Sequence, residues 1–405
     1  MQTQNNIPAL RFPEFDGEWE NKKIGDIAKK VNSGSTPRGG SEVYVTEGIL
    51  FIRSQNVLDS KLSFENSTYI TNEINDSMKN SVVHPNDILL NITGASLGRS
   101  CVVPKEFTIG NVNQHVCIIR LNEKNEPAFI QPIFASKKGQ NIFTSLQTGS
   151  GREGLNFQSI KGISLAFPSK QEQQKIASFL SAVDEKIQQL TRKAALLEQY
   201  KKGIMQQLFS GTLRFKDDDG KDFPEWEEKK LGEFCTFFSG GTPTSTNQKY
   251  YSGTIPFIGS GNIYDSEVFS FITEEALNNS SAKIIKKGDL LYALYGANSG
   301  EVSISKMEGA INQAILCIRN KECIEYLYYV LLSNKDKIVA KFIQGGQGNL
   351  SSQIIKRLKY NFPSLKEQQK IASFLSGIDD KIASVNAQLE KTQTFKKGLL
   401  QQMFV

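Results

Sequence analysis

A long stretch of the sequence occurs twice. Residues 167–187 read FPSKQEQQKIASFLSAVDEKI and residues 362–382 read FPSLKEQQKIASFLSGIDDKI, with 16 of 21 positions identical. Shorter segments repeat in the same order: NSGSTP returns as FSGGTP, and KKGIMQQLF as KKGLLQQMF. LRF also stands at 10–12 and again at 213–215, so joining the two chain ends would continue the pattern. Repetition on this scale predicts that the 405 residues form two like halves.

Each copy of the long stretch predicts one long helix. Ser169 and Ser364 each follow a proline and stand three residues before a glutamate, the spacing of a capping box at a helix start. Apolar residues then recur at alternating spacings of four and three over about five heptads, interrupted by Lys201 and Lys396. We expect the two helices to pair antiparallel, as a rod with a globular domain at each end and a pseudo-twofold axis. Pairing of each helix with another molecule is the alternative.

The segments before the long helices mix strand and helix signals. Short apolar runs bounded by Gly, Pro, Asn and Asp predict strands, and a helix-like stretch follows them in each half, at about 127–146 and 322–343. The sequence therefore predicts an α+β fold with two tandem-repeated domains joined by two long antiparallel coiled-coil helices. The expected boundaries are a first domain at 1–168, a first spacer helix at 169–210, a second domain at 211–363 and a second spacer helix at 364–405. The expected strands are at 49–52, 87–93, 112–121, 255–258 and 289–295.

Motifs for catalysis or metal binding are lacking. The two histidines, His84 and His115, have no histidine at the matching positions of the other half, so we expect them to be structural. The five cysteines are scattered without zinc-binding spacing, which predicts buried free thiols. GSGREG at 149–154 fits a dinucleotide-binding pattern but lacks the flanking strand and helix. We predict no catalytic residue, metal or cofactor on this chain; a nuclease or methyltransferase in a single chain is the competing enzyme hypothesis.

Composition limits the partners only weakly. No uncharged apolar run approaches the roughly 18 residues of a membrane helix, and the first residues lack the regions of a signal peptide. We therefore expect a cytoplasmic protein that does not contact a membrane. The net charge of +6 suits a polyanion such as DNA, although many other proteins share it. Two like domains at a set separation suit duplex DNA, whose half-sites recur about 34 Å apart.

On the doubled EQQKIA helix start, the LRFP start and the two-copy layout, the chain resembles the specificity subunit of type I restriction-modification systems. The resemblance implies two target-recognition domains that read a bipartite site in double-stranded DNA. It implies spacer helices to which two methyltransferase (modification) subunits bind. Motor and nuclease (restriction) subunits would complete the assembly. S-adenosylmethionine, ATP and Mg would bind those partners, which methylate adenine and cleave DNA. A non-catalytic, two-headed protein-binding scaffold is the alternative.

Comparison of the two halves assigns roles to polar residues. Identical positions cannot encode different half-sites, so they are expected to hold loops or contact phosphates; they are Ser54 and Ser260, Asn56 and Asn262, Asn113 and Asn312, and Gln114 and Gln313. Positions that differ within matching frames are candidates for base contacts, with Asn91 and Thr93 pointing outward from one strand face. The Gly-rich loops add Arg152 and Gln347. The predicted DNA-contact set is Arg53, Gln55, Asn91, Thr93, Ser96, Arg99, Arg152, Ser260, Asn262, Tyr295, Asn298 and Gln347.

Overall fold

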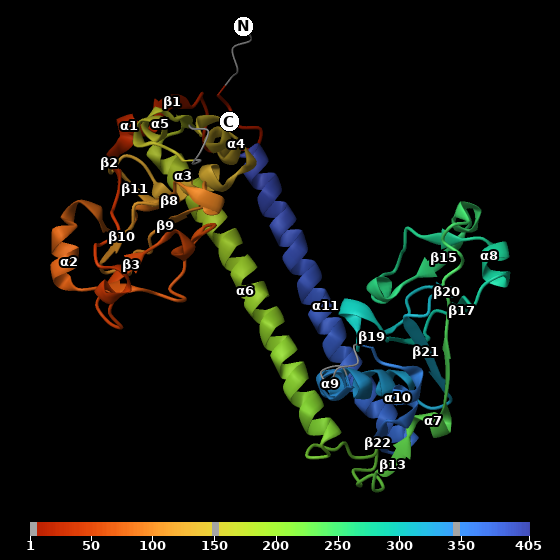
Figure 1. Ribbon diagram of the computed structural model, residues 1–405. Helices are drawn as coiled ribbons and strands as arrows, with labels where there is room; N and C mark the ends of the chain where they lie inside the picture. Colours follow the sequence, from red (N-terminus) through yellow and green to blue (C-terminus); the bar gives the residue numbers. More distant parts are fainter. Residues whose placement is uncertain (1–5, 148–153, 343–348) are drawn as a thin grey trace. The chain divides into compact units, whose positions relative to one another are not determined.

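The computed structural model describes residues 6–147, 154–342 and 349–405 (Figure 1). The chain divides into two compact units. Unit 1 contains the described residues before Arg192 together with Ala387–Val405, and unit 2 is Arg192–Asn386. Each unit therefore takes one part of each long helix, α6 (Lys170–Phe209) and α11 (Leu365–Gln402). Within the described ranges, no helix has the length and apolar character to cross a membrane.

Unit 1 contains two four-stranded sheets and two short strand pairs, one of which is β4 (Val57–Leu58) with β5 (Lys61–Leu62). The first sheet has the order β2-β11-β8-β9 with antiparallel neighbours, and the second has the order β6-β3-β10-β7 with β3 and β10 parallel. The bounds are β1 (Glu20–Lys23), β2 (Ala28–Ser33), β3 (Ile49–Ile52), β6 (Tyr69–Ile70), β7 (Val82–Val83), β8 (Ile88–Asn91), β9 (Ser100–Val102), β10 (Gly110–Val112), β11 (Val116–Leu121) and β12 (Ser164–Phe167), which pairs with β1.

Unit 2 repeats the two four-stranded sheets and the β1–β12 pair, but its described residues contain no counterpart of the β4–β5 pair. Its sheets have the orders β14-β21-β18-β19 and β16-β15-β20-β17, again with one parallel pair, β15 with β20. The sequence repeat is thus a repeat of the fold, and the predicted α+β class is confirmed. The bounds are β13 (Glu227–Lys230), β14 (Cys235–Ser239), β15 (Ile255–Ile258), β16 (Phe271–Ile272), β17 (Lys283–Ile285), β18 (Leu290–Ala293), β19 (Val302–Ile304), β20 (Gly309–Ile311), β21 (Ile315–Asn320) and β22 (Lys359–Phe362), which pairs with β13.

The two inner strands of the first sheet are buried on both faces in each unit; they are β8 and β11 in unit 1 and β18 and β21 in unit 2. In β8, Ile88 and Leu90 belong to the core that packs on the helices, whereas Leu89 belongs to a second core shared with the other sheet. In β18, Leu290 and Leu291 divide in the same way. Alternate side chains of a strand point to opposite faces, so cover on both faces explains why β8 and β18 are apolar at nearly every position. All five cysteines are buried and unpaired, as predicted.

The helix before the Gly-rich loop differs between the units. Unit 2 has one helix, α9 (Ile324–Phe342), close to the predicted 322–343. Unit 1 breaks the predicted 127–146 helix into α3 (Pro127–Ala135) and α4 (Lys137–Leu146). Ser136 adopts an extended conformation at the break, and its Oγ accepts a hydrogen bond of 3.2 Å from Gly139 N, as an N-cap of α4. Short helices α5 (Phe157–Gly162) and α10 (Ser352–Arg357) occupy equivalent places in the two units.

The two long helices pack against each other inside each unit. In unit 1, Leu399 and Met403 near the end of α11 share a core with Ile176 and Leu180 near the start of α6. In unit 2, Met205 and Leu208 near the end of α6 share a core with the start of α11. The start of one helix therefore lies beside the end of the other, which confirms the predicted antiparallel pairing within one chain.

The two lysines that interrupt the heptads form equivalent ion pairs. Lys201 Nζ lies 2.5 Å from Asp379 Oδ1 in unit 2, and Lys396 Nζ lies 2.5 Å from Asp184 Oδ1 in unit 1. All four side chains are at most 35% exposed. Each lysine thus binds an aspartate on the other long helix, one lysine per unit. A polar pair at one seam position fixes the register in which two helices meet.

The predicted capping boxes form only in part. Ser169 Oγ accepts a hydrogen bond of 3.3 Å from Glu172 N, as expected. Ser364 Oγ, however, has no hydrogen-bond partner among the described residues. Both carboxylate oxygens of Glu172 accept hydrogen bonds of 2.8 Å from Arg11, and both oxygens of Glu367 accept from Arg214. The glutamates therefore serve a tertiary contact, which spacing along the chain alone does not indicate.

Candidate nucleic-acid interface

A shallow hollow of about 420 Å³ opens on unit 1 where two short 3-10 turns meet the loop between β10 and β11. The turns are η2 (Ser54–Asn56) and η4 (Gly94–Ser96). Four residues of the predicted DNA-contact set line the hollow together. They come from two separate segments of the sequence, and the fold brings them to one place. We call this site the unit 1 hollow; its lining is Ser54, Gln55, Thr93, Gly94, Ala95, Ser96, Arg99 and His115.

The turn η4 and its counterpart in unit 2, η7 (Gly296–Asn298), have the same backbone conformation. Gly94 and Gly98 have φ of 73° and 87°, and their counterparts Gly296 and Gly300 have 78° and 87°. A side chain disfavours such φ values, so glycine at both ends allows the chain to reverse sharply. Thr93 immediately precedes η4, and Tyr295 immediately precedes the equivalent turn of unit 2. The same backbone therefore carries different side chains in the two units.

Asn91 does not point outward, and that prediction is wrong. Its side chain is fully buried, because the face of β8 that it shares with Leu89 is covered by the second sheet rather than by solvent. Asn91 Nδ2 donates hydrogen bonds of 2.8 Å to Ser54 O and 3.1 Å to Ser96 Oγ. Asn91 Nδ2 therefore holds together the two turns that line the hollow.

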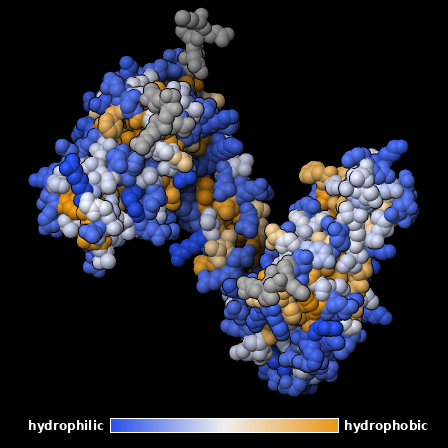
Figure 2. Space-filling model, in the orientation of Figure 1, coloured by the Kyte–Doolittle hydropathy of each residue, from blue (hydrophilic) through white to orange (hydrophobic). Residues whose placement is uncertain are grey.

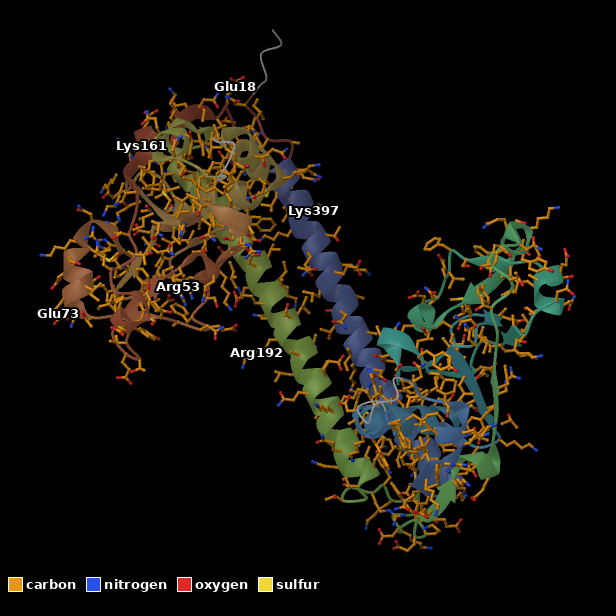
Figure 3. The ribbon with its side chains drawn as sticks, in the orientation of Figure 1. Glu18, Arg53, Glu73, Lys161, Arg192 and Lys397 are labelled. Carbon is orange, nitrogen blue, oxygen red and sulfur yellow. The ribbon has the colours of Figure 1, made fainter. Side chains whose placement is uncertain are left out.

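Two arginines add positive charge at this end of unit 1. Arg99 is exposed and lines the hollow. Arg53 immediately precedes η2 and is half-buried; its position is labelled in Figure 3. Its buried Nε has no hydrogen-bond partner among the residues described. A buried donor without a partner is costly unless a ligand or water supplies an acceptor, so Arg53 is suited to bind one.

Several residues shared by both halves hold loops, as predicted. Asn113 Oδ1 accepts a hydrogen bond of 3.0 Å from His115 N, and Asn312 Oδ1 accepts one of 3.0 Å from Ala314 N. Asn56 is buried and donates through Nδ2 to Ser63 O at 3.2 Å. These asparagines shape the turns by bonding nearby backbone. They support the site without facing it.

The equivalent place in unit 2 carries different chemistry. Ser260 and Asn262 lie on η6 (Ser260–Asn262), which contacts η7 (Gly296–Asn298), where Asn298 lies after Tyr295. All four predicted residues are half-buried. Asn262 Nδ2 donates to Asp265 Oδ2 at 2.9 Å, which leaves its second N–H for another acceptor.

Glu301 stands in unit 2 where unit 1 has Arg99. Its carboxylate accepts hydrogen bonds from Tyr264 Oη, at 2.5 Å, and from Lys335 Nζ. Burial acts to raise the pKa of Glu301, but the bonds from Lys335 and Tyr264 outweigh it and lower the pKa. Burial, and then Glu301, raise the pKa of Tyr264. At this position of the repeated fold, unit 1 therefore has an exposed cation. Unit 2 has a carboxylate that is bound by two side chains.

The site also contains residues that the sequence comparison passed over. His115 was assigned a structural role because its counterpart is Ala314, yet the rule that unlike positions mark candidates would have selected it. Tyr264 and Lys335 are missed because they lie outside the matched motifs and reach Glu301 only through the fold. Arg152 and Gln347 lie outside the described residues, so their predicted role stays a prediction.

Each unit packs on a long helix through the same arginine–glutamate contact, which we call the lock. Arg11 binds Glu172 in unit 1, and Arg214 binds Glu367 in unit 2; both glutamate side chains are at most 2% exposed. The phenylalanine after each arginine packs edge-on against a helix phenylalanine, Phe12 on Phe179 at 5.7 Å and Phe215 on Phe374 at 5.4 Å between ring centroids. The repeated LRF and EQQKIA segments are thus the two sides of one contact.

Comparison with known proteins gives one consistent family. The family model for the type I restriction modification DNA specificity domain matches residues 16–199 and 224–393, which is most of the chain. The chain belongs to this family. The two matched segments correspond to the two halves of the repeat, so this is a specificity-domain chain with two copies of the domain.

Relatives of this specificity-domain chain include the type I restriction enzyme MjaVIII specificity subunit of Methanocaldococcus jannaschii, 26% identical over 97% of this chain and 92% of the relative. Among solved structures, the type I restriction-modification S subunit of M. genitalium superposes with a TM-score of 0.65 at 16% identity, over 98% of this chain and 99% of the other. A chain from a structural study of type I restriction-modification assembly superposes with a TM-score of 0.58 at 18% identity, over 96% and 97%. The structural matches support the fold.

Proposed function

We propose that this chain is the DNA-recognition subunit of a type I restriction-modification complex. Membership of the specificity-domain family supports the role, and the MjaVIII relative is named as a type I restriction enzyme specificity subunit. The duplication supports a target in two parts, because one frame occurs twice with different polar residues exposed on it. The observation that carries most weight is that four residues chosen only because the halves differ there line one hollow: Gln55, Thr93, Ser96 and Arg99.

Unit 1, in this proposal, reads its half-site with Arg99, Arg53 and Gln55. Arginine pairs with guanine O6 and N7, and glutamine with adenine N6 and N7, each with about 1–3 kcal/mol of discrimination against a wrong base. Thr93 and Ser96 add hydroxyl groups at the hollow. In unit 2 the proposed base contacts are Tyr295 and Asn298. Ser260 and Asn262 are proposed to contact DNA phosphates. Arg152 and Gln347 remain proposed backbone contacts.

The partners follow from the same proposal. Two methyltransferase subunits would bind the complex and methylate adenine with S-adenosylmethionine, and motor and nuclease subunits would use ATP and Mg to cleave DNA. This chain would hold none of those cofactors. Because such a complex acts on chromosomal or invading DNA, we place it in the cytoplasm. The gap between half-sites would depend on the lengths of α6 and α11, so inserting four residues, about 6 Å, into each would lengthen the unread gap and leave both half-sites unchanged.

Selection from random duplexes tests the proposal. The purified full chain is incubated with a randomised duplex library, and bound molecules are sequenced. We expect two short conserved segments separated by a fixed unread gap, with affinity that falls steeply with salt as counterions are released. Binding without sequence preference, or one continuous site, would contradict it. A protein-binding scaffold would leave the library unenriched, and a single-chain enzyme would transfer labelled methyl groups or cut DNA without partners.

A further inference from the structure

A chain of hydrogen bonds runs from the surface of unit 1 to the hollow. Thr36 Oγ1 donates to Gln114 Oε1, and Gln114 Nε2 lies 3.1 Å from His115 Nε2. His115 Nδ1 in turn lies 2.6 Å from Thr93 Oγ1. Thr93 and His115 both line the unit 1 hollow, and His115 O accepts from Ile92 N at 3.0 Å, which holds the two segments side by side.

Hydrogen-bonding capacity sets the direction of this chain. An amide nitrogen can only donate, so His115 Nε2 must accept from Gln114. A neutral imidazole carries one hydrogen, which therefore sits on Nδ1 and is donated to Thr93 Oγ1. The hydroxyl oxygen of Thr93 is then occupied as an acceptor by His115. Its own hydrogen stays free to be donated to a ligand in the hollow.

Unit 2 provides an internal comparison. Thr242 Oγ1 donates to Gln313 Oε1 at 2.6 Å, so the threonine–glutamine pair has the same orientation without a histidine beside it. The next residue is Ala314, and Tyr295 replaces Thr93, so the chain stops at the glutamine. The orientation of Gln114 thus belongs to the repeated frame, and His115 extends it to the hollow only in unit 1.

We propose that Gln114 and His115 are positioning residues that make the Thr93 hydroxyl a hydrogen-bond donor toward DNA. Thr93 would then select a major-groove acceptor, guanine O6, thymine O4 or a purine N7, over the amino groups of adenine and cytosine. The inference rests on the proposed function, because it names a base contact in the half-site read by unit 1. Its hydrogen-bond direction can be tested without DNA.

The first test measures the tautomer of His115. The full chain is labelled with ¹⁵N-histidine, and His84→Asn leaves His115 as the only histidine, since His84 forms its bond to Asp87 through the main chain. Two-bond ¹H–¹⁵N spectra well above the usual histidine pKa distinguish the ring nitrogens. We expect the hydrogen on Nδ1. A hydrogen on Nε2 would overturn the proposed direction.

Gln114→Glu should reverse the chain, because a carboxylate can only accept and would take the hydrogen of His115 Nε2. Nδ1 would then accept from Thr93, whose hydroxyl would offer only a lone pair to the hollow. We expect the ¹⁵N signature to switch and the preferred base at one position of the unit 1 half-site to change, by roughly tenfold or more in relative affinity. His115→Ala should relax that position without creating the opposite preference.

Gln313→Glu is the matched control, since it adds the same charge at the same place in unit 2, where no histidine follows. It should weaken binding by charge repulsion without changing any base preference at the unit 1 half-site. A switched tautomer with unchanged base preference in Gln114→Glu would overturn the role in specificity. If the chain binds no duplex at all, the proposed function and the base contact both fail, while the ¹⁵N result still decides the direction of the hydrogen bonds.

Discussion

Arg99 and Glu301 occupy the same place in two copies of one frame, yet one is an open cation and the other a carboxylate held by Tyr264 and Lys335. By contrast, Arg11 with Glu172 and Arg214 with Glu367 are nearly the same contact twice. The difference between these two kinds of position shows how the chain divides its work. The contact between each unit and its helix is repeated, whereas the side chains at the position of Arg99 and Glu301 are not.

The same division explains which predictions succeeded. The fold class, the two-fold repeat and the antiparallel helices followed from periodicity and duplicated motifs, which depend on short stretches of chain. The exposure of Asn91 was predicted wrongly. The alternation of side chains along a strand shows which residues share a face, but not whether solvent or another sheet covers that face. Glu172 was misjudged because its partner Arg11 lies 161 residues away. The surface drawn in Figure 2 is largely hydrophilic, so exposed polarity alone could not have singled out the hollow.

The largest expected effect comes from breaking the repeated lock. Glu367→Ala should lower the free energy of unfolding by about 3–5 kcal/mol, because it leaves the Arg214 guanidinium partly buried without its partner. Trp226 Nε1 also donates to Glu367, at 3.1 Å, whereas Trp19 Nε1 has no partner in the described part of unit 1. Glu172→Ala should therefore cost less. Urea unfolding of both variants checks the order, and equal losses below 0.5 kcal/mol would contradict the role of the lock.

Removing the arginine that lines the hollow should affect recognition of only one half-site. Arg99→Ala should cost about 1–3 kcal/mol of discrimination at one base pair read by unit 1 and leave the other half-site unchanged. Arg99 is exposed, so unfolding should change little. Duplexes with single substitutions in either half-site, titrated against the full chain, measure this. An equal loss across both half-sites would mean that Arg99 contacts phosphates only.

Asn91→Ala makes unit 1 resemble unit 2, which has Ala293 at this position. We expect a loss of about 1–3 kcal/mol in stability, because the substitution removes two hydrogen bonds that hold η2 and η4 and leaves Ser54 O without this donor. Affinity for the unit 1 half-site should fall as the turns loosen, without a new base preference. A changed preference would indicate a direct contact instead, which its burial opposes.

The smallest effect should come from the two seam ion pairs, and it should differ between the units. Lys201 lies 5.5 Å from the Tyr329 ring centroid, and Tyr329 Oη donates to Asp379 at 2.7 Å, so the unit 2 pair belongs to a network. Asp184 and Lys396 line a pocket together with Ala135 of α3, and α3 contains no tyrosine. Double-mutant cycles should give about 1 kcal/mol of coupling for Lys396 with Asp184 and more for Lys201 with Asp379. The reverse order would contradict the network.

The central claim is that unlike residues on a repeated frame choose the bases, and grafting them tests it most directly. Gln55→Gly, Thr93→Tyr, Arg99→Glu and His115→Ala together give unit 1 the residues that unit 2 has at these places. Selection from random duplexes with the full chain should then show the first half-site shifted toward the second, with the second half-site and the gap unchanged. A first half-site identical to that of the unaltered chain would contradict the account.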